Sequence, residues 1–196
     1  MPTSERSLTP KEQSRLSSYA RIGLQMIGEF EDTRPSAVVA AIDGCVDMLQ
    51  RKQRGWLARL LNLKSNNTET ARALGVTWGD QVVREFGWEW VVVLLDGKRF
   101  FAVTPPDRSL AIYPTEFILE CLDAPQADCT VSLSFDMLRS GSIPMQTPLS
   151  YTSVMPAIHR LKPKHALNLK RVPGPALFGV EDRDGRLCAD LVFVKA

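Results

Sequence analysis

The stretch FGWEWVVVLLDGKRFFAVTP, residues 86–105, holds two apolar runs on either side of an Asp-Gly pair. Runs rich in Val, Phe and Trp around such a pair are typical of a β-hairpin with a two-residue turn. We therefore expect strands over residues 88–95 and 98–104. A third strand over residues 109–113, after a proline-rich turn, would complete a three-stranded meander.

Two helices are predicted in the N-terminal part of the chain. Apolar residues recur every three or four positions over residues 10–30, where Thr9 and Glu12 have the spacing of a capping box. The same periodicity follows Pro35, a residue that suits the first turn of a helix. It continues to a basic run, whose charge favours the carbonyl end of a helix dipole. Each helix should turn one apolar face to a core.

A third helix should lead directly into the hairpin, over residues 68–86. It contains Gly75 and Gly79, and glycine weakens a helix interior by about 1 kcal/mol relative to alanine. Glycines at such positions indicate either close packing against another backbone or a break in the helix. We expect this helix to run in two pieces.

After the meander, the predicted structure changes from helix to loop. A helix begins at Pro114, an alternating pattern over residues 130–135 predicts a short strand, and residues 140–156 have a loop composition. A terminal hairpin is expected within residues 176–194. The fold class is therefore α+β, with N-terminal helices packed on a mostly antiparallel sheet that has a central β-meander and a C-terminal hairpin.

The whole chain, residues 1–196, is expected to be one domain, because no linker separates its halves. Residues 1–67 would be its helical part, 68–125 its helix–meander–helix core, and 126–196 a loop-rich C-terminal elaboration with the terminal hairpin. The N-terminus has no secretory apolar segment, and the longest apolar run has six residues, whereas a membrane helix needs about 20. We expect a cytoplasmic location.

The sequence has no pattern that would hold a metal or another cofactor. Its four cysteines form no CxxC pair and only two histidines are present, which disfavours a structural zinc site. It has no GxxxxGK[ST] phosphate loop and no GxSxG nucleophile elbow. We expect neither a metal nor another cofactor.

Charge is distributed in blocks along the chain. Residues 51–75 carry six bases and one acid, residues 76–140 carry five bases and ten acids, and residues 141–171 carry five bases and no acid. If these blocks fold onto separate faces the surface is polarised, and if they meet they neutralise one another. The last block is the predicted partner-binding surface, and its five bases are Arg160, Lys162, Lys164, Lys170 and Arg171.

A second candidate site lies where the third helix meets the hairpin. Asp80, Glu85 and Glu89 cluster in the sequence at this corner, and two carboxylates in one cleft can divide the roles of acid and base. Tryptophans on either side of Glu89 would raise the pKa of its carboxyl group by desolvation.

We favour a structural interpretation of Glu89. Side chains alternate along a strand, so Trp88 and Trp90 should point to the core while Glu89 points away from it. Glu89 would then meet water or pair with Lys98 or Arg99 across the hairpin.

A pattern of glycines, acids and tryptophans runs through the middle of the chain. It reads LGxxxGDxxVxExG, then WxWV, and later a proline before the next helix. Its residues here are Leu74, Gly75, Gly79, Asp80, Val83, Glu85, Gly87, Trp88, Trp90 and Pro114. Over residues 70–125 the chain resembles a bacterial domain family known only as a domain of unknown function. The resemblance implies a helix, a strand, a hairpin and a further helix, and implies no chemistry.

Taken together, these features favour non-catalytic protein binding in a bacterial cytoplasm. One concrete version is an immunity protein that neutralises a cognate toxin, using the basic segment over residues 141–171 or the acidic segment over residues 76–140. One alternative is an enzyme of unrecognised type that uses the carboxylates named above. A weak nucleic-acid-binding module is a further alternative, disfavoured because no aromatic residues interleave with the bases.

Overall fold

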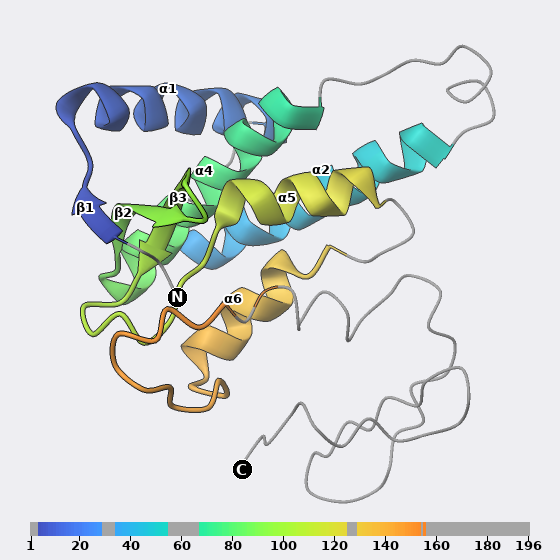
Figure 1. Ribbon diagram of the computed structural model, residues 1–196. Coiled ribbons are helices and arrows are strands. Elements are labelled where there is room, and N and C mark those ends of the chain that lie inside the picture. The colour runs from blue at the N-terminus through green and yellow to red at the C-terminus, as the bar shows by residue number, and fades with distance from the viewer. Residues whose placement is uncertain (1–3, 29–33, 55–66, 125–128, 154, 156–196) are drawn as a thin grey trace, which may run out of the picture.

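The computed structural model describes residues 4–28, 34–54, 67–124, 129–153 and 155, and Figure 1 shows its arrangement. These residues form helices and one antiparallel sheet, which confirms the α+β class. The elements in chain order are β1 (Ser4–Ser7), α1 (Pro10–Ile27), α2 (Pro35–Arg54), α4 (Asn67–Phe86), β2 (Glu89–Leu95), β3 (Lys98–Thr104), α5 (Pro114–Asp123) and α6 (Val131–Arg139).

The predicted hairpin is the centre of the sheet. Strand β2 pairs antiparallel with β3 from Glu89↔Thr104 to Leu95↔Lys98. The turn residues Asp96 and Gly97 have φ values of 49° and 74°, and a type I′ turn needs this left-handed backbone at both central positions. The prediction of an Asp-Gly hairpin is therefore confirmed.

The third strand of the sheet is not the predicted one. The N-terminal strand β1 pairs antiparallel with β2, so the strand order is β1-β2-β3. Residues 109–113 make only isolated bridges, Val103↔Ile112 and Leu110↔Thr152. The chain turns just before this segment, at Pro105, Pro106 and Arg108. The prolines have no N–H to donate and Arg108 has a left-handed backbone (φ 58°), so no continuous ladder forms along β3.

The N-terminal helix begins as predicted. The Thr9 hydroxyl accepts from the Glu12 backbone N–H at 3.3 Å, and the Glu12 carboxylate accepts from the Thr9 backbone N–H at 2.8 Å. This reciprocal pair is the capping box. Helix α1 ends at Ile27, three residues before the predicted end, and Gly28 follows it with φ 95°.

Helix α4 is continuous over Asn67–Phe86, so the prediction of two pieces was wrong. The close-packing explanation of its glycines is correct instead. A Cβ on Gly75 would lie 2.7 Å from the Thr115 Cα, and one on Gly79 would lie 2.2 Å from the Trp90 ring. Both glycines therefore let α4 approach its neighbours more closely than any side chain would allow.

The predicted strand over residues 130–135 is wrong, because Val131–Arg139 is helix α6. Val131 and Phe135 are both buried, and they stand four residues apart on one helix face. A six-residue alternation of apolar and polar residues also satisfies this spacing, so the pattern was too short to separate the two structures.

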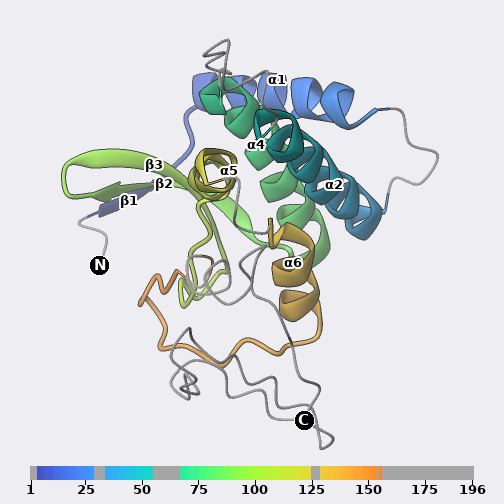
Figure 2. The same ribbon diagram turned by 90° about the vertical axis from the view of Figure 1, so that its right-hand side faces the viewer.

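The core lies among the helices, which gather on one side of the hairpin in Figure 2. Helix α4 contacts α1, α2 and α5, and its Trp78 is fully buried at 5.6 Å from the Phe117 ring centroid. Ile42 of α2 and Phe135 of α6 complete this cluster. None of the described helices is both long and apolar enough to cross a bilayer. The predicted C-terminal hairpin, residues 176–194, lies outside the described residues.

Candidate binding groove

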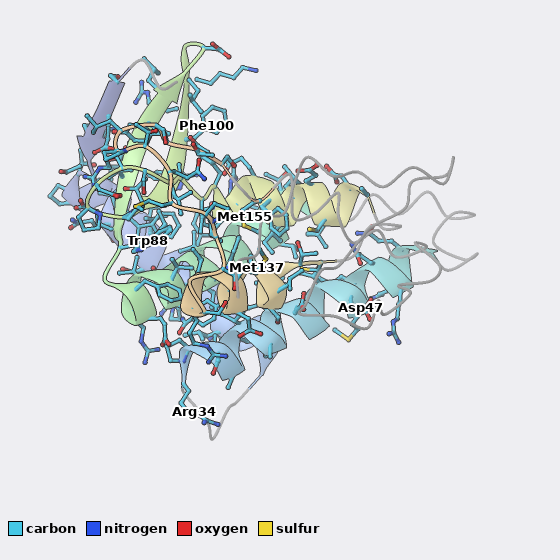
Figure 3. The ribbon with its side chains drawn as sticks, turned by 90° about the horizontal axis from the view of Figure 1, so that it is seen from below. Arg34, Asp47, Trp88, Phe100, Met137 and Met155 are labelled. Carbon is cyan, nitrogen blue, oxygen red and sulfur yellow. The ribbon has the colours of Figure 1, made fainter. Side chains whose placement is uncertain are left out.

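A groove of about 490 Å³ opens where α1, α4 and the start of β2 meet. Figure 3 labels Trp88 at this junction, between the end of α4 and the sheet. The groove combines apolar side chains, hydroxyls and carboxylates, and none of its lining residues is basic. They are Ser7, Leu8, Gln13, Leu16, Ser17, Asp80, Val83, Trp88, Glu89 and Trp90.

Asp80 provides the groove with a partly buried carboxylate. Its Oδ1 accepts a hydrogen bond from the Trp90 indole Nε1 at 2.8 Å. Burial raises the pKa of this carboxyl group, while the Trp90 hydrogen bond and the positive charge of Arg84 oppose that rise. The sequence pointed to Asp80 as a candidate but gave no sign that Trp90 would be its partner.

Glu89 begins β2 and points away from the Trp90 side of the sheet, as predicted. Its side chain is 56% exposed, and its Oε1 lies 2.6 Å from Nη2 of Arg108. The predicted pairing with Lys98 or Arg99 is wrong. Those two residues stand opposite Leu95 and Leu94, at the turn end of the hairpin, whereas Glu89 stands opposite Thr104 at the other end.

The two tryptophans of the WxWV pattern lie between the helical core and the groove. Trp88 and Trp90 are both half-buried, and both pack against the helical core, as expected, while also lining the groove. Trp88 lies 6.2 Å from the Phe86 ring, measured between ring centroids. By contrast Trp78 is fully buried in the core.

The three candidate acid/base residues are only partly brought together. Asp80 and Glu89 both line the groove, whereas Glu85 is exposed on α4 and does not line it. Because β2 side chains alternate, the Glu89 carboxylate leaves the groove side and meets Arg108 on the other face. Among the described residues, no group of three His, Cys, Asp or Glu side chains could hold a metal ion.

A polar cluster that the sequence did not indicate lies behind Glu89. Arg108 Nε donates to both oxygens of Glu5 at 3.0 Å, and the Tyr151 hydroxyl donates to Glu5 Oε2 at 2.7 Å. Arg108 and Tyr151 both have left-handed backbones, with φ values of 58° and 49°. Glu5 stands 103 and 146 positions from these partners, so no local pattern could have joined them.

The predicted partner-binding bases all fall outside the described residues. They are Arg160, Lys162, Lys164, Lys170 and Arg171. One candidate binding surface in the described part of the chain is the groove, which belongs to the acidic segment over residues 76–140 and to the N-terminal residues packed against it.

Comparison with known proteins finds a similarity in the central segment of the chain. A model of the family described as "Domain of unknown function (DUF3806)" matches residues 56–131, the part of the chain that contains α4, the hairpin and α5. This confirms the predicted resemblance to a domain family of unknown function. The searches of curated proteins and of solved structures found no match.

Proposed function

We propose that this protein binds another protein without catalysis, and that the groove receives a basic segment of the partner. The observation that carries the proposal is a groove that combines two half-buried tryptophans with the carboxylate of Asp80, and that has no base among its described lining residues. The concrete version is a bacterial cytoplasmic immunity protein, whose partner would be the toxin that it neutralises.

The tryptophans supply the apolar part of this interface. Tryptophan is enriched among the residues that carry most of the energy of protein–protein binding. Trp88 and Trp90 are half-buried in the protein alone, so a partner could cover what remains of their rings without rearranging the core. Their position beside Leu8 and Leu16 extends this apolar surface onto the N-terminal residues.

The carboxylate of Asp80 supplies the preference for a cation. One oxygen of Asp80 is held by Trp90, which fixes the carboxylate and leaves its other oxygen to accept from a lysine or arginine of the partner. A guanidinium or ammonium group in this position also lies near aromatic faces, where cation–π attraction adds to the charge pairing.

The supporting experiment is affinity capture with the tagged full-length chain at several salt concentrations, followed by identification of stoichiometric partners. Trp88→Ala and Asp80→Asn should each lower the yield of the partner at least tenfold. Glu85→Gln removes an exposed carboxylate from the same helix outside the groove and should leave capture unchanged.

Two results would overturn the assignment to the groove. The first is capture that survives both groove variants. The second is capture lost only in Lys162→Glu/Lys164→Glu, which would move the interface to the basic C-terminal segment. The absence of any partner at every salt concentration would contradict the whole proposal.

An acid/base enzyme is the second candidate, because Asp80 and Glu89 line one groove. Burial raises the pKa of Asp80 and so favours a proton donor, and Glu89 would have to act as the ionised partner. The pairing of Glu89 with Arg108 on the opposite sheet face weighs against this role. Turnover of any substrate that is lost in both Asp80→Asn and Glu89→Gln would favour the enzyme.

A further inference from the structure

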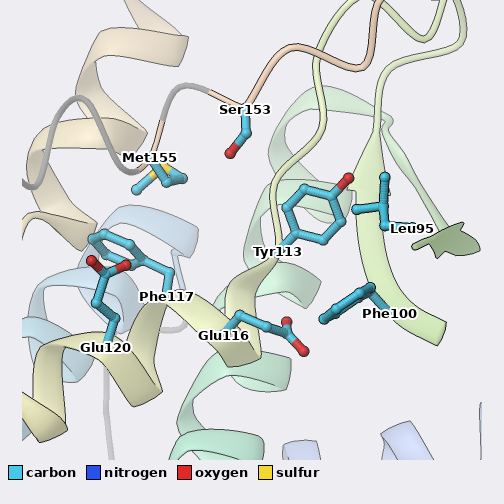
Figure 4. Close-up of a pocket in the computed structure, with 8 residues that line it drawn as sticks. All are labelled: Leu95, Phe100, Tyr113, Glu116, Phe117, Glu120, Ser153 and Met155. Atoms are coloured by element: carbon cyan, nitrogen blue, oxygen red, sulfur yellow. The ribbon is translucent and has the colours of Figure 1, made fainter. Parts of the chain in front are cut away.

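A second, smaller cavity lies on the opposite face of the sheet from Trp90. Its volume is about 190 Å³, and it opens between the turn end of the hairpin and the first turns of α5 (Figure 4). Leu95 and Phe100 come from the hairpin, Tyr113 precedes α5, and Phe117 lies on α5. The cavity shares no lining residue with the groove, so a ligand bound in it would be independent of the proposed function.

The apolar walls of this cavity are already in place. Phe100 and Tyr113 meet edge to face, with ring centroids 6.0 Å apart. Phe117 is 3% exposed and Met155 is 1% exposed, so both are fixed by the core behind them. Dry cavities of about 150 Å³ with such walls hold a benzene ring. This cavity is therefore large enough for a substituted ring or a branched aliphatic chain.

One wall carries a carboxyl group with one oxygen that has no hydrogen-bond partner among the described residues. Oε2 of Glu116 is shielded from solvent and accepts no hydrogen bond from any described residue. Figure 4 shows this carboxyl group pointing toward the ring of Phe100, at the edge of the apolar wall. Burial raises the pKa of this carboxyl group, an effect that a hydrogen bond from the Glu116 backbone N–H and the positive charge of Arg72 oppose in part. A buried acceptor without a donor is costly in a folded protein, and a bound donor would remove that cost.

The charges around the cavity have one sign. Among the described residues, Glu116 and Glu120 are the ionisable carboxylates that line it, and no lysine or arginine does so. Arg72, whose positive charge lowers the pKa of Glu116, is ion-paired with Glu69 on α4. An anionic ligand would thus be repelled, and a neutral hydrocarbon would leave Oε2 of Glu116 unpaired.

We propose that this cavity binds a small organic amine, whose apolar ring or branched chain fills the cavity and whose ammonium group donates to Glu116. A rotation of the Glu116 side chain toward the cavity would place one N–H donor on the unpartnered oxygen and would give the buried carboxylate an opposite charge. Recognition thus requires both parts of the ligand, because neither the walls nor the carboxylate is sufficient alone.

The test uses phenethylamine as the probe, titrated into the full chain and followed by ligand-observed NMR. Its counterpart 3-phenylpropionate has a similar shape and the opposite charge. We expect saturable binding of phenethylamine and none of 3-phenylpropionate. Glu116→Gln should weaken the binding of phenethylamine at least tenfold, whereas the matched control Glu120→Gln, at an exposed position of the same cavity, should change it less than twofold.

A second variant keeps the test independent of the carboxylate. Ser153 is exposed at the rim of the cavity, so Ser153→Phe should block entry without disturbing the core. It should abolish phenethylamine binding and leave the unfolding temperature unchanged. Absence of saturable binding to the wild type would overturn the proposal. So would equal binding of the two probes, or binding by Glu116→Gln and Ser153→Phe that matches the wild type.

Discussion

The two faces of the sheet are covered in different ways. On the Trp90 side, helix α4 packs against β2 and β3, and Gly79 lets it approach the Trp90 ring closely. On the other side, Val91, Val93 and Ala102 are covered by irregular segments that include Tyr113 and Tyr151. Close steric packing stabilises the first face. On the second face, the hydrogen bonds and ion pairs of Arg108 and Tyr151 hold the irregular segments against the sheet.

This difference determines which substitutions each face should tolerate. Shape-based packing fails when a side chain is added, because neighbouring backbone cannot move aside. A polar cluster fails when one member is removed, because its partners stay buried without hydrogen bonds. We therefore expect the largest loss of stability from added volume on the helix face, and a smaller loss from a deleted charge on the loop face.

The largest effect is expected for Gly75→Ala in α4. The added Cβ would lie 2.7 to 2.8 Å from backbone atoms of Pro114 and Thr115, so α5 would have to shift. Overpacking of this kind costs about 3 kcal/mol of unfolding free energy. Urea denaturation followed by circular dichroism measures it.

Gly44→Ala is the matched control for that substitution. Gly44 also lies inside a helix, α2, but its added Cβ would meet no atom within 4 Å. This change should stabilise the protein by about 0.5–1 kcal/mol, because alanine favours the helix. A Gly75→Ala protein as stable as Gly44→Ala would show that α4 and α5 do not pack as tightly as the structure indicates.

A smaller effect is expected for Arg108→Gln on the loop face. This change removes the ion pair with Glu89, the hydrogen bonds to Glu5 and the hydrogen bond from Nη1 to the Pro105 carbonyl oxygen. The side chains of Arg108 and Glu5 are 16% and 19% exposed, so solvent replaces the lost contacts poorly. We expect a loss of about 2 kcal/mol in unfolding free energy, measured by the same urea denaturation.

The control for Arg108 is Arg139→Gln. Arg139 pairs with Asp136 at 2.8 Å, but their side chains are 51% and 59% exposed. Exposed pairs of this kind contribute less than about 1 kcal/mol, so the control should be nearly neutral. Equal effects at both arginines would mean that the loop face is held by its apolar contacts and not by its charges.

The same contrast explains what could be predicted from sequence. The helices over residues 10–27, 35–54 and 67–86 and the hairpin produce local signals: apolar periodicity, a capping box and an Asp-Gly turn. Those signals come from residues a few positions apart, so they can be recognised in a single sequence. The Gly75 and Gly79 contacts were open to two explanations, because the neighbours that fill the space beside them come later in the chain.

The missed features depend on distant residues. Strand β1 has a polar sequence, SERS, and becomes a strand only because β2 offers it an edge. Arg108 binds Glu5 and Glu89, which no spacing rule connects to it. The sequence predicted a cleft beside Asp80 and Glu89. It could not predict the wall that α1 supplies, because the packing of α1 against α4 depends on contacts between residues far apart in the chain.

The smallest effect is expected for Asp80 on the helix face, where its carboxylate accepts a hydrogen bond from Trp90. Burial raises the pKa of Asp80 above the ordinary value of 3.8. The folded protein therefore holds this proton more tightly than the unfolded chain does. Its contribution to stability is greatest below pH 3.8 and declines as pH rises through the folded-state pKa, which gives a negative slope.

Asp80→Asn removes that slope. Relative to the wild type, the variant should gain stability as pH rises from about 3 to about 7, by less than the loss expected for Arg108→Gln. Trp90→Phe should act in the opposite direction, because it deletes the donor that stabilises the ionised carboxylate and so steepens the wild-type decline. Urea midpoints measured across this pH range test both, with Glu85→Gln as the exposed control on the same helix. If Asp80→Asn instead loses stability as pH rises, the ionised carboxylate stabilises the fold, and the helix face, like the loop face, depends on charge.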